Sequence, residues 1–198
     1  MRTFIAIEFP PTIQQQLADA ARQLRAHLRA HNAPDCLRWA GLHNAHLTLR
    51  FLGDTTDAQA QALAVALEAI AQKQPPFELA LDSVGGFPHL RQPRVLWLGV
   101  AGDMTQLCAL QSAVEQCVQR AGLAAETQPF SPHVTLARAD RQATKSDLRR
   151  IGELVGVYAA AARGEPLRFA VNAFVHMESR LQRGGAVHTP LRHFRLGG

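Results

Sequence analysis

Two tetrapeptides with the same pattern, His46-Leu47-Thr48-Leu49 and His133-Val134-Thr135-Leu136, hold the residues best suited to chemistry. Alternate side chains of a β-strand point to the same side, so each histidine shares a face with the threonine two positions later. A neutral imidazole can take a proton from water while a protonated one gives a proton to a departing oxygen. The pair therefore predicts acid–base chemistry at a phosphodiester, with each Thr hydroxyl donating to a non-bridging phosphate oxygen.

The alternative is that these histidines are structural or bind a metal. One His-x-Thr strand would carry little information, but two copies, each with apolar residues on the opposite face, favour a functional site. Neither motif has an adjacent Asp or Glu, and neither contains the H-x-x-x-H or H-E-x-x-H spacing of metal sites. We therefore expect no metal and no cofactor.

The elements that must position these motifs follow from apolar periodicity and turn residues. Strands are expected at 1–9, 47–52, 77–81, 94–100, 133–138, 169–175 and 187–196. Helices are expected around the apolar stripes at 13–28, 63–70, 107–117 and 148–154, and a turn at 85–88. The two histidines lie 87 residues apart within similar series of strands and helices, which suggests a diverged internal duplication. We expect one α+β domain over 1–198, with approximate halves 1–85 and 86–198.

The composition is typical of a soluble globular protein, with 47% apolar and 19% charged residues and no apolar run of membrane-spanning length. The net charge is +5, and all basic residues except Lys73 and Lys145 are arginines. This balance fits an anionic partner, although a genome rich in arginine codons would give the same bias. Three cysteines without paired spacing favour a reducing, cytoplasmic location. The oligomeric state is left open, with a monomer expected.

The chain resembles the RNA 2′,3′-cyclic phosphodiesterases, also called 2′-5′ RNA ligases, of the 2H phosphoesterase superfamily. The matching blocks, in chain order, are 2–7, 46–53, 86–88, 94–97, 130–138 and 178–181. The resemblance implies an ATP-independent hydrolase that opens an RNA-terminal 2′,3′-cyclic phosphate to a 2′-phosphate, with a reverse 2′-5′ ligation. It also implies a bilobal fold of two antiparallel sheets that face each other across a groove, with the helices outside.

Opening toward a 2′-phosphate requires the 3′ oxygen to leave, with an acid beside it and a base opposite. We assign His46 as proton donor and His133 as proton acceptor, although the residues themselves leave the order open. Arg138 matches the family's motif and is the expected third contact. Regular strand parity would put it on the wrong face, so it needs a bend in the strand.

Three further side chains have alternatives that the sequence leaves open. Arg50 has the same strand parity as His46 and is either a substrate contact or a solvated edge residue. Phe51 and Trp39 either stack on a base or pack in the protein. His188 stands where family members often have an aromatic residue. It either alters contact with the nucleobase or is a surface substitution.

Two other functions compete with this assignment. One is a related phosphodiesterase activity on another cyclic or 2′-5′ linked nucleotide, because the same four residues would serve. The other is an RNA-binding module without catalysis, against which the intact His and Thr of both motifs argue. His43 and His89 have no partnering threonine and are expected to be loop residues.

Overall fold

The structure is a computed structural model that describes residues 1–161, 165–182 and 185–197. The elements in chain order are β1 (Arg2–Glu8), α1 (Pro11–Ala30), β2 (Leu37–Trp39), the 3-10 turn η1 (Leu42–Asn44), β3 (His46–Asp54), α2 (Asp57–Ala71), β4 (Phe77–Phe87), β5 (Val95–Gly102), α3 (Met104–Arg120), β6 (His133–Ala139), α4 (Lys145–Ala161), β7 (Leu167–Val171), β8 (Ala173–Gln182) and β9 (Gly185–Arg195). None of the described helices is both long and apolar enough to cross a membrane.

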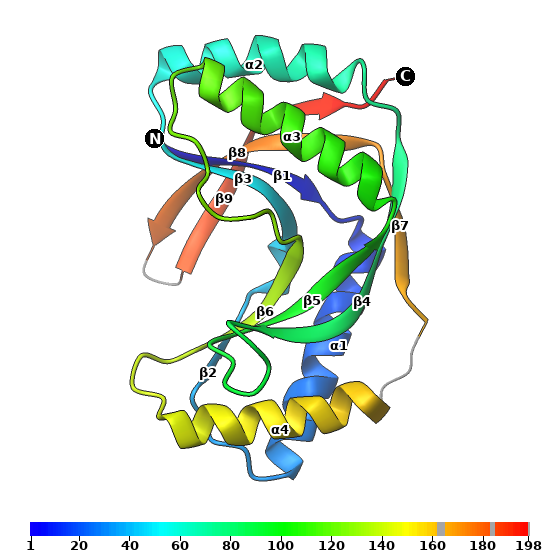
Figure 1. Ribbon diagram of the computed structural model, residues 1–198, viewed down its shortest axis with the longest axis vertical. Helices are drawn as coiled ribbons and strands as arrows, with labels where there is room; N and C mark the ends of the chain where they lie inside the picture. Colours follow the sequence, from blue (N-terminus) through cyan, green and yellow to red (C-terminus); the bar gives the residue numbers. More distant parts are fainter. Residues whose placement is uncertain (162–164, 183–184, 198) are drawn as a thin grey trace.

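The strands form two antiparallel sheets, with order β3-β1-β8-β9 in sheet A and β2-β6-β5-β4-β7 in sheet B. Helices α2 and α3 pack on sheet A, whereas α1 and α4 pack on sheet B. Figure 1 shows these helix pairs at opposite ends of the molecule, with the strands between them. We call the helix-covered side of each sheet its outer face and the other side its inner face. The expected bilobal α+β fold with two antiparallel sheets is confirmed.

The two sheets repeat one strand order, since β3-β1-β8-β9 corresponds to β6-β5-β4-β7. The repeated units follow the expected division near residue 85, but the lobes do not. The last strand of the first unit, β4, lies in sheet B, and its counterpart β8 lies in sheet A. Helices α1 and α3 likewise pack on the sheet opposite to that of the strand before them. The lobes therefore do not coincide with the sequence halves 1–85 and 86–198, because each unit exchanges elements with the other.

Three regions of the chain differ from the sequence prediction of strands. Strand β4 continues to Phe87 through the expected turn at 85–88. Gly85 is the register partner of Trp97 and lies under its indole, where a Cβ would come within 2.2 Å of the ring. The single strand expected at 169–175 is two strands. The chain leaves sheet B at Val171 and enters sheet A at Ala173. The short strand β2 was not predicted.

The core joins the outer faces of the sheets to the helices. Ile5 and Leu47 of sheet A pack with Leu63 and Leu110, and all four side chains are fully buried. Thr56 begins α2 with a reciprocal capping box to Gln59, an arrangement that stabilises a helix by about 1 kcal/mol. The apolar residues between the motif histidines and threonines thus anchor strands whose other face is free of helices.

Candidate active site

The first motif lies on the inner face of sheet A. In the register of β1 and β3, His46 is opposite Glu8 and Thr48 is opposite Ala6. Side chains of register partners point to the same side. Ala6 belongs to a small apolar cluster separate from the main core, whereas Leu47 belongs to the main core. His46 and Thr48 therefore share the inner face, as strand parity predicts.

Two rings pack against the His46 imidazole. The Phe4 ring centroid lies 4.8 Å from that of His46, and His188 meets the imidazole edge-on at 5.1 Å. Phe4 and His188 also contact each other at 5.0 Å. His188 is half-buried, and burial lowers its pKa, which favours the neutral form. The surface-substitution alternative for His188 is therefore wrong, because its ring packs directly on a candidate catalytic histidine.

The second motif lies on the inner face of sheet B. His133 is opposite Gly99 and Thr135 is opposite Trp97 in the register of β5 and β6. His133 Nδ1 donates to the carbonyl of Ser131 at 2.7 Å. The Phe87 ring meets the imidazole edge-on at 4.8 Å, and the Trp97 ring lies 6.4 Å away. Strands β3 and β6, which begin with the two motif histidines, contact each other although they belong to separate sheets (Figure 1).

Both motif strands contain a β-bulge at the same position. Leu49 and Leu136 are the unpaired residues, each directly after the motif threonine. A bulge reverses the alternation of faces beyond it. Arg138 is consequently on the same face as Thr135, and its Nη2 donates to the Thr135 hydroxyl at 3.5 Å. The bend that the assignment of Arg138 required is present.

In β3 the same bulge places Phe51 on the inner face. Phe51 is the register partner of Phe4, their ring centroids are 6.0 Å apart, and its side chain is 62% exposed. An exposed phenyl ring beside the motif has a free surface for stacking. Trp39, the other aromatic considered, is opposite Ala137 and packs against the main core.

Arg50 does not point to the inner face. The bulge turns it to the outer face, opposite the fully buried Ile5. Its guanidinium is 8% exposed and is held by Glu115 and Glu126 and by two backbone carbonyls. Its expected role as a substrate contact is therefore wrong, and so is the alternative of a solvated edge residue. The prediction from regular alternation of side chains placed Arg50 on the wrong face, because the sequence gives no sign of the bulge at Leu49.

Sequence reasoning missed the residues that reach the motifs from neighbouring strands. Glu8 lies opposite His46, and its carboxylate accepts a hydrogen bond from His193 Nε2 at 2.7 Å. Arg38 is the register partner of Arg138 and pairs with Asp140 at 2.7 Å. Only knowledge of the strand pairing could have placed Glu8 opposite His46 and Arg38 opposite Arg138. The strand that carries Arg38, β2, was itself not predicted. His43 and His89 are exposed and lie outside the strands, as expected.

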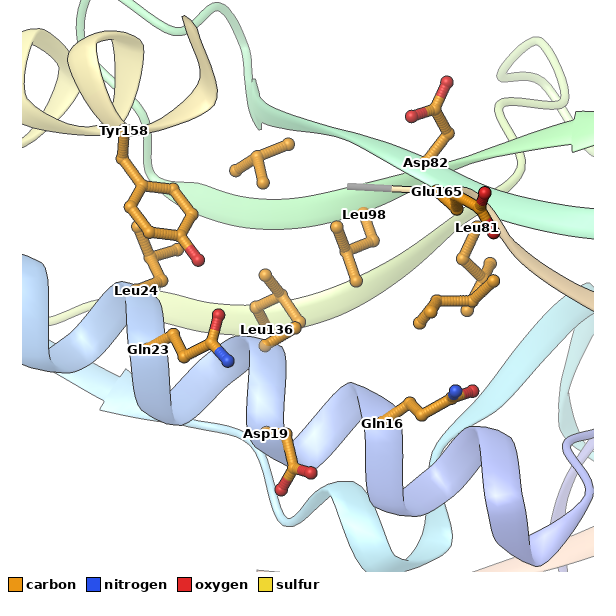
Figure 2. Close-up of a pocket in the computed structure, with 13 residues that line it drawn as sticks. Gln16, Asp19, Gln23, Leu24, Leu81, Asp82, Leu98, Leu136, Tyr158 and Glu165 are labelled. Atoms are coloured by element: carbon orange, nitrogen blue, oxygen red, sulfur yellow. The ribbon is translucent and has the colours of Figure 1, made fainter. Parts of the chain in front are cut away.

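A cavity of about 310 Å³ lies away from the motifs, on the outer face of sheet B. Figure 2 shows its apolar floor of Leu98 and Leu136, with Gln23 of α1 and Tyr158 of α4 at its border. Leu136 lies on the opposite face of β6 from His133 and Thr135, so the cavity and the second motif are on opposite faces of β6. Among residues 1–161, 165–182 and 185–197, no three His, Cys, Asp or Glu side chains form a group that could hold a metal ion.

The sequence resembles curated proteins over most of its length. An RNA 2′,3′-cyclic phosphodiesterase of Aquifex aeolicus is 33% identical over 81% of this chain and 82% of the relative. An RNA 2′,3′-cyclic phosphodiesterase of Escherichia coli is 32% identical over 98% of this chain and 96% of the relative.

Solved structures share the whole fold. The crystal structure of TT0787 of Thermus thermophilus has a TM-score of 0.76 at 25% identity and covers 100% of this chain and 99% of that chain. E. coli LigT in complex with 3′-AMP has a TM-score of 0.70 at 30% identity, over 98% and 97% of the two chains. The family model described as the 2′-5′ RNA ligase superfamily matches residues 9–183. The chain therefore belongs to the 2′-5′ RNA ligase superfamily.

Proposed function

We propose that the protein hydrolyses the 2′,3′-cyclic phosphate at an RNA end to a 2′-phosphomonoester and also joins RNA ends through 2′-5′ linkages. The observation that carries this proposal is the placement of two His-x-Thr motifs at equivalent positions of two sheets, both on inner faces. The relatives named RNA 2′,3′-cyclic phosphodiesterase support the choice of substrate. The RNA end would lie between the inner faces, in contact with both strands.

In the proposed reaction, the imidazole of His133 takes a proton from a water molecule whose oxygen attacks phosphorus. The bond from phosphorus to the 3′ oxygen breaks, and His46 gives its proton to that oxygen. The hydroxyls of Thr48 and Thr135 donate hydrogen bonds to the non-bridging oxygens, where negative charge increases in the transition state. The cycle consumes one water, and the two histidines exchange protonation states, so solvent must restore them.

Two contacts favour this order of acid and base. The Ser131 carbonyl can only accept, so Nδ1 of His133 carries the hydrogen, and Nε2 of the neutral ring is left with a lone pair for water. Glu8 is the register partner of His46 and carries its carboxylate on the same face of the sheet, where a negative charge would stabilise the imidazolium form that an acid needs. Gly99 occupies the corresponding place beside His133 and brings no charge.

Arg138 and Phe51 are the proposed contacts to the rest of the substrate. The Arg138 guanidinium, next to the Thr135 hydroxyl, would bind a phosphate oxygen. The exposed Phe51 ring would stack on a base. We propose a cytoplasmic location as well, which three unpaired cysteines support.

The test is hydrolysis of an oligonucleotide that ends in a 2′,3′-cyclic phosphate, with and without EDTA, followed by identification of the product. We expect a 2′-phosphate, unchanged activity in EDTA and a bell-shaped pH dependence. His46→Ala and His133→Ala should each lower kcat on the order of 10²–10⁴-fold. His89→Ala, which removes an exposed loop histidine, is the control and should leave kcat unchanged.

Each competing function predicts a different result. A 3′-phosphate product would contradict the proposed leaving group. Turnover only of other cyclic or 2′-5′ linked nucleotides would identify a related phosphodiesterase. Salt-sensitive RNA binding without any product would indicate a binding module. Near-normal turnover by either histidine variant would refute the site.

A further inference from the structure

Arg50 joins the strand of the first motif to the polypeptide that leads into the second. Its Nε donates to Glu115 Oε2 of α3 at 2.5 Å, and its Nη2 donates to the carbonyl of Ala124 at 2.5 Å. Nη1 donates to the carbonyl of Phe51 at 2.5 Å and to Glu126 Oε2 at 3.3 Å. All three nitrogens of one buried guanidinium are therefore engaged, with partners from β3, α3 and the segment that follows α3.

That segment, residues 121–132, depends on side chains for its position. Within the described part of the chain, no backbone-to-backbone hydrogen bond outside helices and strands involves residues 124–132. Glu115 Oε1 accepts from the Glu126 N–H at 3.0 Å, and Glu126 Oε1 accepts from the N–H groups of Thr127 and Gln128. Near the end of the segment, the carbonyl of Ser131 accepts a hydrogen bond from the His133 imidazole and orients it.

In the other unit of the duplication, the equivalent segment is held in place by backbone hydrogen bonds. There, the segment between α1 and β3 forms strand β2, which pairs with β6, and the Ala40 N–H donates to the carbonyl of the bulge residue Leu136 at 2.9 Å. Sheet A has no strand in the corresponding place, so β3 is an edge strand. Figure 1 shows the segment from α3 to β6 passing beside β3 without forming a strand. Arg50, Glu115 and Glu126 lie where a strand paired with β3 would supply backbone hydrogen bonds.

We propose that Arg50 is a positioning residue that holds the second motif in register with the first. Its guanidinium fixes the segment 121–132 to β3, and the segment fixes the orientation of His133 relative to His46. The position equivalent to Arg50 in β6 is Ala137, which is fully buried and carries no polar group. We call Arg50 with Glu115 and Glu126 the clamp, and this clamp exists in one unit only. Its catalytic consequence rests on the function proposed above, whereas its structural consequence does not.

The contact between Arg50 and Glu115 depends on the charge of Glu115, whose pKa is lowered. Burial by itself would raise the pKa of Glu115, but hydrogen bonds from Gln119, the Glu126 backbone and Arg50 outweigh burial and lower it. Glu115 therefore stays ionised at neutral pH and takes up a proton only at a pH lower than is usual for a glutamate. A change in pH profile on breaking the clamp would accordingly report on the imidazoles and not on Glu115.

The test replaces Arg50 by Met, which keeps the length of the stem and removes all four hydrogen bonds. Displacing a catalytic group by about 1 Å costs on the order of 10²-fold, so we expect kcat to fall about 10–100-fold with a much smaller change in KM. Amide hydrogen exchange of 124–128 should accelerate, and the imidazole nitrogen signals of His133 should shift. Arg168→Met is the matched control, because it removes an exposed ion pair to Glu78 at the edge of sheet B.

Folding is checked by circular dichroism, and assays are run well below the unfolding temperature. If Arg50→Met does not fold, Glu126→Ala provides the test, because it removes the contact from Arg50 to Glu126 and the hydrogen bonds that Glu126 accepts from Thr127 and Gln128, while the Arg50–Glu115 pair remains. A folded variant with the wild-type kcat and unchanged exchange at 124–128 would overturn the proposal. If the wild-type protein itself fails to open the cyclic phosphate, the proposed function fails, while exchange and the His133 signals still decide whether the clamp exists.

Discussion

The two motif strands have the same geometry but different neighbours. Both have a half-buried histidine and threonine, then a buried bulge residue, then one further buried residue. Around His46 the inner face is apolar, with Phe4, Ala6, Val175 and Met177 forming a buried cluster. The corresponding positions around His133 carry Val95, Trp97, Gly85 and Phe87.

The polar residues differ more than the apolar ones. Beyond the bulge, Phe51 of sheet A corresponds to Arg138 of sheet B, and Glu8 corresponds to Gly99. Sheet A therefore offers an exposed ring and a carboxylate, whereas sheet B offers a guanidinium beside its motif threonine. The duplication has kept the two His-x-Thr motifs and changed the residues that surround them. Two equivalent histidines can thus have opposite tasks.

The exchange of Phe51 for Arg138 predicts the largest difference between the sheets. If Arg138 binds phosphate as proposed, Arg138→Met removes a charged hydrogen bond, typically worth about 1.5–3 kcal/mol, or roughly 10–100-fold in kcat/KM. Phe51→Leu removes only stacking, so we expect a several-fold increase in KM and no change in kcat. The measurement is steady-state hydrolysis of a cyclic-phosphate oligonucleotide, and a larger loss in Phe51→Leu would reverse the comparison.

The carboxylate of Glu8 predicts a smaller effect, on the pH profile. If Glu8 stabilises the protonated form of His46, then Glu8→Gln makes the acid lose its proton more easily. The alkaline limb of kcat should move to lower pH, while the acid limb, which reports the base, should stay. Glu68→Gln makes the same change of charge on the outer face of sheet A and should move neither limb. A shift of the acid limb instead would exchange the roles of the two histidines.

The motifs themselves could be located from sequence, because strand parity and apolar anchors are local properties. The division into helices and strands followed from periodicity for the same reason. What depended on pairing between distant segments could not be predicted. The bulge at Leu49 is one case, because it moved Arg50 to the outer face and Phe51 to the inner face. The bulge at Leu136 places Arg138 on the same face as Thr135, as the family motif implied. Regular alternation of the strand would have placed it on the opposite face.

Elements that change partners were also beyond local reasoning. The apolar pattern of 169–175 is continuous, but Asn172 separates β7 in sheet B from β8 in sheet A. Strand β2 has three residues, too few for a periodic signal, and exists because β6 has a free edge to pair with. Arg38 was hidden for this reason. Its position opposite Arg138 depends on a strand that the sequence does not show.

The smallest expected effect concerns stability and again separates the sheets. His176 lies on the outer face of sheet A, is 2% exposed, and has no partner for Nε2 among the described residues, whereas the equivalent position of sheet B is Gly86. Burial lowers its pKa, as it does for His188, so the folded state resists protonation while the unfolded state binds a proton normally. The unfolded state then holds more protons below its ordinary pKa of about 6.5, and stability must fall as the pH decreases from there.

Urea unfolding at about pH 7.5 and about pH 5.5 measures this loss above the range in which carboxylates titrate. We expect the wild-type midpoint to decrease between the two conditions and the decrease to be smaller in His176→Leu. His43→Leu, an exposed histidine outside the strands, should keep the full decrease. An equal decrease in His176→Leu would mean that the acid sensitivity originates elsewhere, because the outer face of sheet A would then lose no stability through its buried imidazole.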